Sequence, residues 1–357
     1  MNSLRIRPII VCILLIQLLW GAFSGETAAG KRPDSTCRFI SSIFIQLNSY
    51  NATWPEEKWD DTFKAMKRLG FEQIIVQWCR QNDIRYYKTP DSAGRTETGH
   101  VQKTGSETGE ETCVLETILL MCEKYKFSYY LGLYDDAAFW AEIKAPSDAL
   151  EYYMYTLILE NLKVVRELSN NVSGRSGFLG YYIPQEIDDI TWNETEKTRL
   201  LKMFLDIMGS RIRETTPNAG ILISTFFRGR VSSNWFAERW RTLLAEKPID
   251  ALLVQDGIGS GQVTLEILAN QLSALSDSLR GSGVALWSVV EAFTSVEAGE
   301  GEFKAVSADA ARIESQLSAA GPAEKAIAFS MKYFIPSPDV DGSEKLFTDY
   351  EKFTKTH

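Results

Sequence analysis

The feature that most constrains the fold is a strict alternation of short apolar runs with longer stretches of helical spacing. Each apolar run has the length and composition of a buried strand, and a helical stretch follows each one. The eight strands are expected near residues 38–46, 72–78, 127–134, 177–183, 220–227, 249–256, 284–293 and 326–333. Strict alternation predicts a parallel sheet, and eight units predict a single-domain α/β protein, a (β/α)8 TIM barrel spanning residues 37–357.

The alternative architecture is a doubly wound open sheet. It is disfavoured because no Gly-x-Gly-x-x-Gly turn follows the first strand. One long polar stretch, residues 80–110, is expected to be a loop after strand two, and its Tyr86 and Tyr87 are candidates for a lid or subsite. The helix after the seventh strand is expected from about residue 305 to 317.

Several local signals predict where elements begin and end. Thr53 and Glu56 have the spacing of a capping box at the start of the first helix. Pro184 cannot donate to a sheet ladder, so the fourth strand is expected to stop there. Thr191 or Asn193 is expected to cap the helix that follows this strand.

The first 24 residues have the pattern of a secretory signal peptide. Arg5 and Arg7 precede an apolar run over residues 9–20, and small residues follow it up to Ser24. The run is short for a membrane span, although an uncleaved anchor stays open as the alternative. We therefore expect cleavage of residues 1–24 and a secreted or periplasmic protein that is not held at a membrane.

The charge balance argues against one class of partner. The formal net charge is −9 for the whole chain, and loss of Arg5 and Arg7 with the leader makes it −11. Such a surface repels phosphate backbones, and the sequence has no basic stripe, so nucleic acid is not an expected partner.

Cysteine and histidine usage gives no support for a metal or cofactor. Export permits disulfides among the four cysteines outside the leader, and their pairing stays open: Cys37, Cys79, Cys113 and Cys122. No Cys-x-x-Cys is present, and only His100 and His357 could assist a metal site. We expect no metal site and no cofactor, with Cys122 as a core residue.

Two glutamates stand at corresponding places in the pattern. Glu186 follows the apolar part of strand four, and Glu291 follows that of strand seven. In a barrel both strands end on the same face, where the chemistry of such enzymes lies. Two carboxylates, one protonated and one ionised, are the minimum for hydrolysis of a glycosidic bond. Asp188 and Asp189 would raise the pKa of Glu186 if they lie close to it.

Six stretches carry a resemblance to a known family. They are Phe44-Ile-Gln46 with Trp54 and Trp59, Leu133-Tyr-Asp-Asp136 with Phe139-Trp140, Tyr182 to Asp188, Ser224 to Phe227, Val254 to Gly259, and Leu286-Trp-x-x-x-Glu291. Together they resemble the bacterial domain of unknown function 4434 family, regarded as TIM-barrel glycoside hydrolases, over residues 39–335. The two glutamates also look like the acid/base and nucleophile of clan-A retaining glycoside hydrolases.

The resemblance implies roles for individual residues. It implies that Glu186 is the general acid/base and that Glu291 is the nucleophile, with Asp135 or Asp256 as the alternative partner. It further implies hydrogen-bonding wall residues at Gln46, Gln77, Tyr134, Gln255 and Asp256. The clan has Asn before the acid/base residue, where this chain has Gln185, whose longer amide is a candidate for the same contact.

Aromatic residues near strand ends are candidates for stacking on sugar rings, with core packing as the alternative. They are Trp78, Tyr134, Trp140, Trp192, Phe226, Phe227 and Trp287.

Three functions follow from these residues. The leading one is an exported glycoside hydrolase that acts on a polysaccharide or oligosaccharide with retention, for which the carboxyl carbons lie about 5–5.5 Å apart, against about 6.5–9.5 Å for inversion. The second is a carbohydrate-binding barrel without catalysis. The third is a metal-dependent lyase or isomerase built on Glu186, Asp256 and Glu291.

Overall fold

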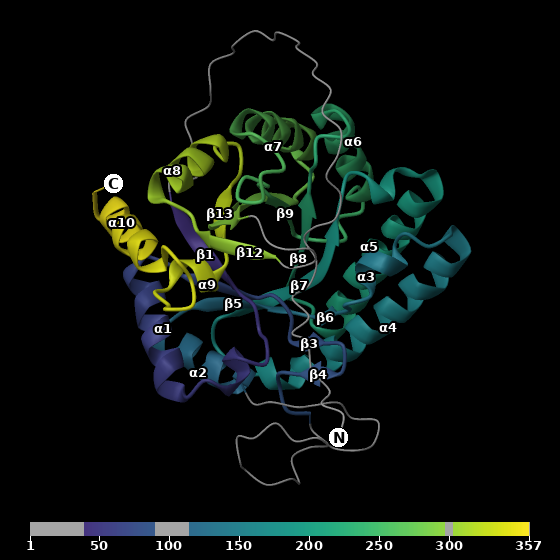
Figure 1. Ribbon diagram of the computed structural model, residues 1–357. Helices are drawn as coiled ribbons and strands as arrows, with labels where there is room; N and C mark the ends of the chain where they lie inside the picture. The colour runs from purple at the N-terminus through teal and green to yellow at the C-terminus, as the bar shows by residue number, and fades with distance from the viewer. Residues whose placement is uncertain (1–38, 90–113, 297–302, 357) are drawn as a thin grey trace, which may run out of the picture.

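The computed structural model describes residues 39–89, 114–296 and 303–356. Eight parallel strands close into one barrel in the order β1, β13, β10, β9, β8, β7, β5, β2, and helices surround it (Figure 1). The predicted single-domain (β/α)8 barrel is thereby confirmed. The signal-peptide prediction, Cys37 and Cys113 fall outside the described residues, as does most of the loop predicted at 80–110.

The barrel strands match the eight apolar runs. Their bounds are β1 Ile40–Ile45, β2 Gln73–Val76, β5 Ser128–Gly132, β7 Phe178–Ile187, β8 Gly220–Phe226, β9 Ala251–Gln255, β10 Ala285–Glu291 and β13 Lys325–Phe329. The outer helices are α1 Glu56–Arg68, α2 Val114–Tyr125, α4 Ser147–Val172, α5 Thr195–Thr215, α6 Ser233–Leu243, α7 Leu265–Leu279, α8 Ala310–Ala319 and α10 Ser343–Thr356.

Short elements decorate the loops, mostly at the carboxyl ends of the strands. They are η1 Asn51–Thr53, β3 Arg80–Gln81, β4 Ile84–Arg85, β6 Tyr134–Asp135, α3 Phe139–Glu142, η3 Thr191–Asn193, β11 Phe293–Val296, β12 Lys304–Ser307 and α9 Met331–Phe334. β3 pairs with β4 and β6 in a three-stranded sheet, and β11 pairs with β12 in a hairpin. The pieces that shape the barrel mouth are therefore mostly outside the eight-fold pattern.

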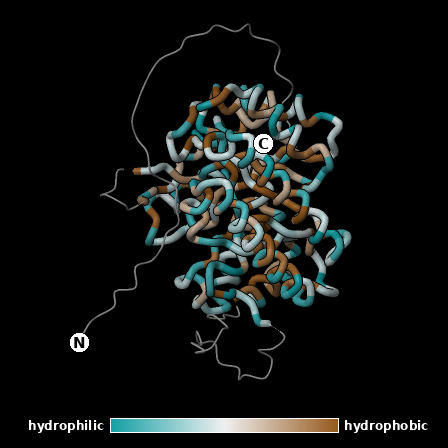
Figure 2. The backbone as a smooth tube through the Cα atoms, turned by 90° about the vertical axis from the view of Figure 1, so that its right-hand side faces the viewer, coloured by the Kyte–Doolittle hydropathy of each residue, from teal (hydrophilic) through white to brown (hydrophobic). Residues whose placement is uncertain are grey.

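Apolar side chains form two cores. The larger one lies between the strands and the outer helices, and hydrophobic residues (brown) recur along the chain between hydrophilic ones (Figure 2). The smaller core fills the inside of the barrel and includes Tyr130, Tyr182, Leu253 and Trp287. None of the helices in the described part of the chain is long and apolar enough to cross a membrane.

Several predicted boundaries were wrong. Thr53 does not cap α1, because its hydroxyl donates to the Tyr50 carbonyl at 2.9 Å and Pro55 is the N-cap residue. β7 continues past Pro184 to Ile187. Its pairing with β8 is irregular between Ile183 and Ile187, so the ladder needs no donor from the proline.

Three other boundaries also differ from the expectation. α5 begins at Thr195 without a side-chain cap, since residues 191–193 form a 3-10 turn of their own. Residues 304–307 pair with β11 as strand β12, so α8 begins later than expected, with Asp309 as its cap. Residues 331–334 are helical, so β13 ends at Phe329. At residues 304–307, pairing with β11 replaced the first turn of the expected helix. At residues 331–334, a helical turn replaced the end of the expected strand.

Candidate active site

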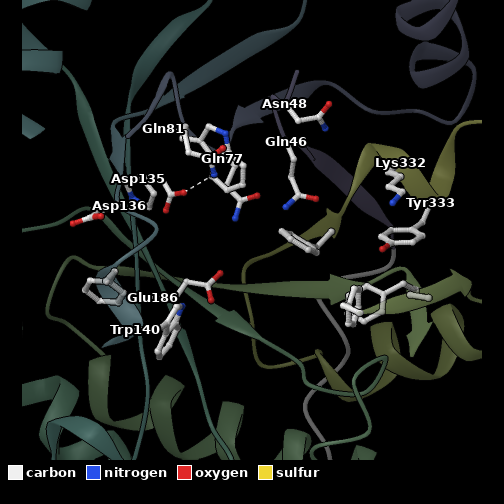
Figure 3. A pocket seen from close by; sticks show the side chains of 17 residues that line it. Gln46, Asn48, Gln77, Gln81, Asp135, Asp136, Trp140, Glu186, Lys332 and Tyr333 are labelled. Atoms are coloured by element: carbon white, nitrogen blue, oxygen red, sulfur yellow. Dashed lines mark hydrogen bonds between the residues drawn. The ribbon is translucent and has the colours of Figure 1, made fainter. Parts of the chain in front are cut away.

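A cavity of about 210 Å³ lies at the carboxyl ends of the strands. Its walls come from the ends of β1, β2, β5, β7 and β13 and from the β11–β12 hairpin (Figure 3). Six of the residues predicted from the sequence line it: Gln46, Gln77, Trp78, Asp135, Trp140 and Glu186. This is the face on which barrel enzymes place their chemistry.

Glu186 enters the cavity from β7, two residues after Pro184, which also lines it. Burial raises the pKa of Glu186 to about 7; a hydrogen bond from Gln255 lowers it, and the charge of Asp135 raises it. The burial effect dominates because a carboxylate loses its hydration in a low-dielectric site. Glu186 can therefore hold a proton near neutral pH, as a general acid must.

Asp135 enters the same cavity from β6, on the same side of it as Glu186 (Figure 3). Burial raises its pKa to about 6; the hydrogen bond from Gln81 lowers it, and the charge of Asp136 raises it. The Gln81 Nε2 donates to the Asp135 Oδ2 at 2.9 Å, and the two residues are paired in register between β3 and β6. Two carboxyl groups with different pKa values thus face one space.

Asp188 and Asp189 do not act on Glu186 as the sequence suggested. The Asp188 carboxylate accepts from the backbone of Thr191 at 2.6 Å, and Asp189 accepts from the backbone of Arg228 at 3.0 Å. Both carboxylates are buried turn anchors. Neither contributes to the raised pKa of Glu186.

The stretch after β2 begins with secondary structure, although its composition suggested a featureless loop. Its described part contains β3 and β4, and β3 supplies Gln81 to the cavity wall. Tyr86 and Tyr87 are buried, and the Tyr87 hydroxyl donates to Glu167 at 2.5 Å. The lid or subsite suggested for the two tyrosines was wrong, because they pack into the core.

Gln185 faces away from the cavity. Its Nε2 donates to the Tyr134 carbonyl at 2.7 Å, and its Oε1 accepts from Asn161 on α4 at 3.4 Å. Gln185 thus links β6 to β7 and holds the strand that carries Asp135. The Tyr134 side chain does not line the cavity either; the Arg80 guanidinium lies 4.7 Å from its ring centroid.

Glu291 is buried outside the cavity lining. Its Oε2 accepts from the Ser260 backbone at 2.7 Å, and its Oε1 accepts from the Ser260 hydroxyl at 3.3 Å. Burial and, to a lesser extent, the charge of Glu291 raise the pKa of Tyr333, a residue of the cavity wall, to about 12. Glu186 and Glu291 therefore do not share the cavity in this structure.

Asp256 is a second buried carboxylate beside Glu291. It accepts hydrogen bonds from the Ile258 and Glu291 backbones and from the Gln316 side chain at 2.5 Å. Burial raises the pKa of both carboxyl groups, and the charge of Asp256 further raises that of Glu291. Gln255, its neighbour in the chain, reaches Glu186 through a hydrogen bond although it does not line the cavity.

Three of the predicted stacking residues belong to the core. Trp192 is fully buried, and Phe227 packs against Phe236 with ring centroids 5.2 Å apart. Trp287 lies inside the barrel, with its ring centroid 6.1 Å from that of Tyr130. The Lys325 ammonium lies over its ring, 4.3 Å from the centroid. Core packing, the alternative considered from the sequence, describes all three.

Several lining residues were missed by reasoning from the sequence alone. They are Asn48, Gln81, Phe303, Ala305, Phe329, Lys332 and Tyr333. The polar pair Lys332-Tyr333 just past an apolar strand resembles the signal that singled out Glu186. It was hidden because the strand was expected to run through these two residues.

Cysteines and acidic clusters complete the description. Cys79 and Cys122 are buried free thiols, so the core placement expected for Cys122 is confirmed. In the residues that the structure describes, no group of three or more His, Cys, Asp or Glu side chains could hold a metal ion. Glu186, Asp256 and Glu291 thus do not form the cluster that the metal-dependent alternative requires.

Comparison with solved structures shows the same fold in carbohydrate-active enzymes. A protein of Bacteroides thetaiotaomicron, provisionally described as an alpha-L-fucosidase, aligns with a TM-score of 0.69 and 18% identity over 93% of this chain and 100% of its own. An endo-1,4-beta-mannanase from Rhizomucor miehei aligns with a TM-score of 0.50 and 10% identity over 93% of this chain and 97% of its own. At these identities the likeness establishes the fold alone.

Sequence comparison is more specific. The uncharacterized protein YbcH of Escherichia coli (strain K12) is 26% identical over 240 residues, which cover 67% of this chain and 72% of YbcH. The model of the family described as domain of unknown function (DUF4434) matches residues 40–342, which include all eight barrel strands and every residue of the cavity. The chain belongs to this DUF4434 family.

Proposed function

We propose that this protein is an exported glycoside hydrolase that cleaves a polysaccharide or oligosaccharide. The observation that carries the proposal is the pair Glu186 and Asp135, which face one cavity with raised pKa values. Amide side chains and the indole rings of Trp78 and Trp140 share the cavity, a lining that suits the hydroxyls and apolar faces of sugars. The glycosidase names of proteins with the same fold support this choice.

In this proposal Glu186 is the general acid. Its pKa of about 7 keeps a useful fraction protonated near neutrality, so it can donate to the leaving oxygen of the glycosidic bond. Asp135, with a pKa of about 6, is ionised at the same pH and attacks the sugar or activates water. The negative charge of Asp135 helps to hold the proton on Glu186, as such a pair requires.

Glu291, the partner implied by the family resemblance, stays a prediction. It would act on a sugar only after giving up two hydrogen bonds to Ser260 and turning into the cavity, which it does not line. Asp135 needs no such movement, so we favour it as the second carboxylate. Retention of configuration also stays a prediction, to be read from the anomer first formed.

The test combines a substrate screen with three isosteric variants. The full chain without its leader is assayed on nitrophenyl glycosides and oligosaccharides, then as Glu186→Gln, Asp135→Asn and Glu291→Gln. We expect Glu186→Gln and Asp135→Asn each to lower kcat by about 10²–10⁴, the size of an acid or base contribution. Glu291→Gln should retain most of the activity if Asp135 is the partner.

Leaving-group dependence separates the two roles. A dinitrophenyl glycoside needs little help from an acid, so Glu186→Gln should lose far less activity on it than on an oligosaccharide, while Asp135→Asn should lose activity on both. Loss of activity in Glu291→Gln with an unaffected Asp135→Asn would restore the pair implied by the resemblance. Sugar binding with no turnover on any substrate would favour the non-catalytic carbohydrate-binding barrel.

A further inference from the structure

Lys332 is the sole Lys, Arg or His among the described residues that line the cavity. It stands on α9 at the end of β13, on the other side of the cavity from Asp135 and Glu186 (Figure 3). Its neighbours Met331 and Tyr333 are buried, so the backbone that carries the ammonium is held by the core. The cavity thus has acids on one wall and a cation on the opposite wall.

No acidic side chain neutralises this cation. Many bases of the described surface form ion pairs, including the neighbouring helix residues Lys345, Lys352 and Lys355, whereas no carboxylate of the described chain pairs with Lys332. The contact found for its ammonium is a long one, 5.7 Å to the ring centroid of Tyr333. Lys332 is exposed and lines the cavity as its one positive charge among the described residues, in a chain with a formal net charge of −9.

A second donor points to the same place. The Gln46 Oε1 accepts from the Ser330 hydroxyl at 3.3 Å, which orients the amide so that its Nε2 faces the cavity (Figure 3). Gln46 and Ser330 come from β1 and β13, which are neighbours in the barrel. An ammonium and an amide N–H₂ on adjoining walls form a set that contributes only donors and suits the oxygens of an anion.

We propose that Lys332, with Gln46, makes the cavity selective for sugars that carry an anionic group, a uronic acid carboxylate or a sulfate ester. This inference rests on the proposed carbohydrate function. An anion held at Lys332 would orient the ring, and the opposite side of the ring would then face Glu186 and Asp135. The net acidity of the protein disfavours binding of anions elsewhere on its surface, which makes this single cation a means of selection.

The experiment measures binding to the Glu186→Gln variant, in which the proposed turnover is blocked. The probes are D-glucuronate and D-galacturonate, each against its neutral counterpart, with glucose 6-sulfate to separate sulfate from carboxylate. Trp78 and Trp140 line the cavity and report binding by fluorescence, with calorimetry as the check. We expect the charged sugars to bind about ten-fold more tightly, as a charge-assisted hydrogen bond provides, with a preference that weakens as salt is added.

Second-site variants assign the preference. Adding Lys332→Met should reduce the preference for charged sugars to within about two-fold while neutral sugars bind as before. Lys332→Arg should retain the preference, because it keeps the positive charge although it changes the shape of the side chain. Lys352→Met on α10, where the lysine is paired with Asp349, is the matched control and should change nothing. Thermal unfolding confirms that each variant is folded.

Two failures can be told apart. Equal affinity for neutral and charged sugars, or a preference that survives Lys332→Met, would overturn the selectivity and leave the carbohydrate function intact. No binding of any sugar would remove the proposed function itself, and the selectivity with it.

Discussion

At the scale of single residues, the two carboxyl groups of the cavity are tuned by different amides. Gln255 lowers the pKa of Glu186 by donating to its ionised form. We expect Gln255→Leu to raise that pKa above about 7 and to move the alkaline limb of the pH–rate profile upward, because the acid stays protonated to a higher pH. The profile of kcat/KM checks this; an unchanged alkaline limb would remove Glu186 as the acid.

Gln81 has the matching effect on the other limb. Its amide lowers the pKa of Asp135, which burial nevertheless raises to about 6. Gln81→Leu should raise this pKa further, so activity should begin to fall at a higher pH on the acidic side. The two variants should thus move opposite limbs of one profile, and movement of the same limb by both would contradict the assignment.

Residue-level features were only partly predictable from the sequence. Glu186 was identifiable because a carboxylate directly follows an apolar strand and a proline. Glu291 gave the same signal, yet its side chain is bound by Ser260, which lies 31 residues earlier in the chain. Whether a strand-end side chain faces the mouth or a neighbouring loop depends on such tertiary contacts, and no local pattern encodes them.

At the scale of elements, one arginine fastens the hairpin that forms a wall of the cavity. Arg312 on α8 donates to the carbonyls of Glu291 at 3.0 Å and Phe293 at 2.6 Å, where β10 passes into β11. We expect Arg312→Met to lower the free energy of unfolding by about 1–3 kcal/mol, because the Phe293 carbonyl loses this donor while the Glu291 carbonyl keeps the Gln316 amide. It should also raise KM, because Phe293 and Phe303 would be held less firmly.

Urea unfolding and steady-state kinetics measure the two effects. Arg280→Met, at an exposed arginine that pairs with Asp277 on the surface, is the control and should cost no more than about 0.5 kcal/mol. Full stability in Arg312→Met would show that the hairpin is held by other contacts.

The eight barrel strands were predictable because each is a self-contained apolar run. The two-residue strands were not, since β3, β4 and β6 exist only through their pairing with one another, which brings Gln81 opposite Asp135. A segment of two residues has no periodicity to read. The barrel could therefore be predicted from the sequence, whereas much of the cavity wall, built from such short pieces, could not.

At the scale of the whole molecule, the buried pair Asp256 and Glu291 links stability to pH. Both folded-state pKa values are raised above the ordinary values of 3.8 and 4.5. As pH rises, the unfolded chain releases these protons first, so the free energy of unfolding should fall from about pH 4 to about pH 8. Glu291→Gln keeps the shape without the charge and should reduce this fall by about 1 kcal/mol or more, since one pKa unit is worth about 1.4 kcal/mol.

Calorimetric unfolding of wild type and Glu291→Gln at several pH values tests this. Glu57→Gln, a change at an exposed glutamate of α1, is the control and should leave the slope unaltered. Equal slopes for Glu291→Gln and wild type would mean that the pair is ionised in the folded protein.

The packed interior of the barrel has a consequence for how substrate enters and product leaves the site. The side chains of Tyr130, Leu253 and Trp287 fill the inside of the barrel, so no ligand can pass through the barrel from the amino ends of its strands. Substrate and product must therefore enter and leave through the same opening, at the carboxyl ends of the strands. If the protein cleaves sugars, a departing fragment stands in the path of the next substrate, and accumulating product should slow turnover as a competitive inhibitor does.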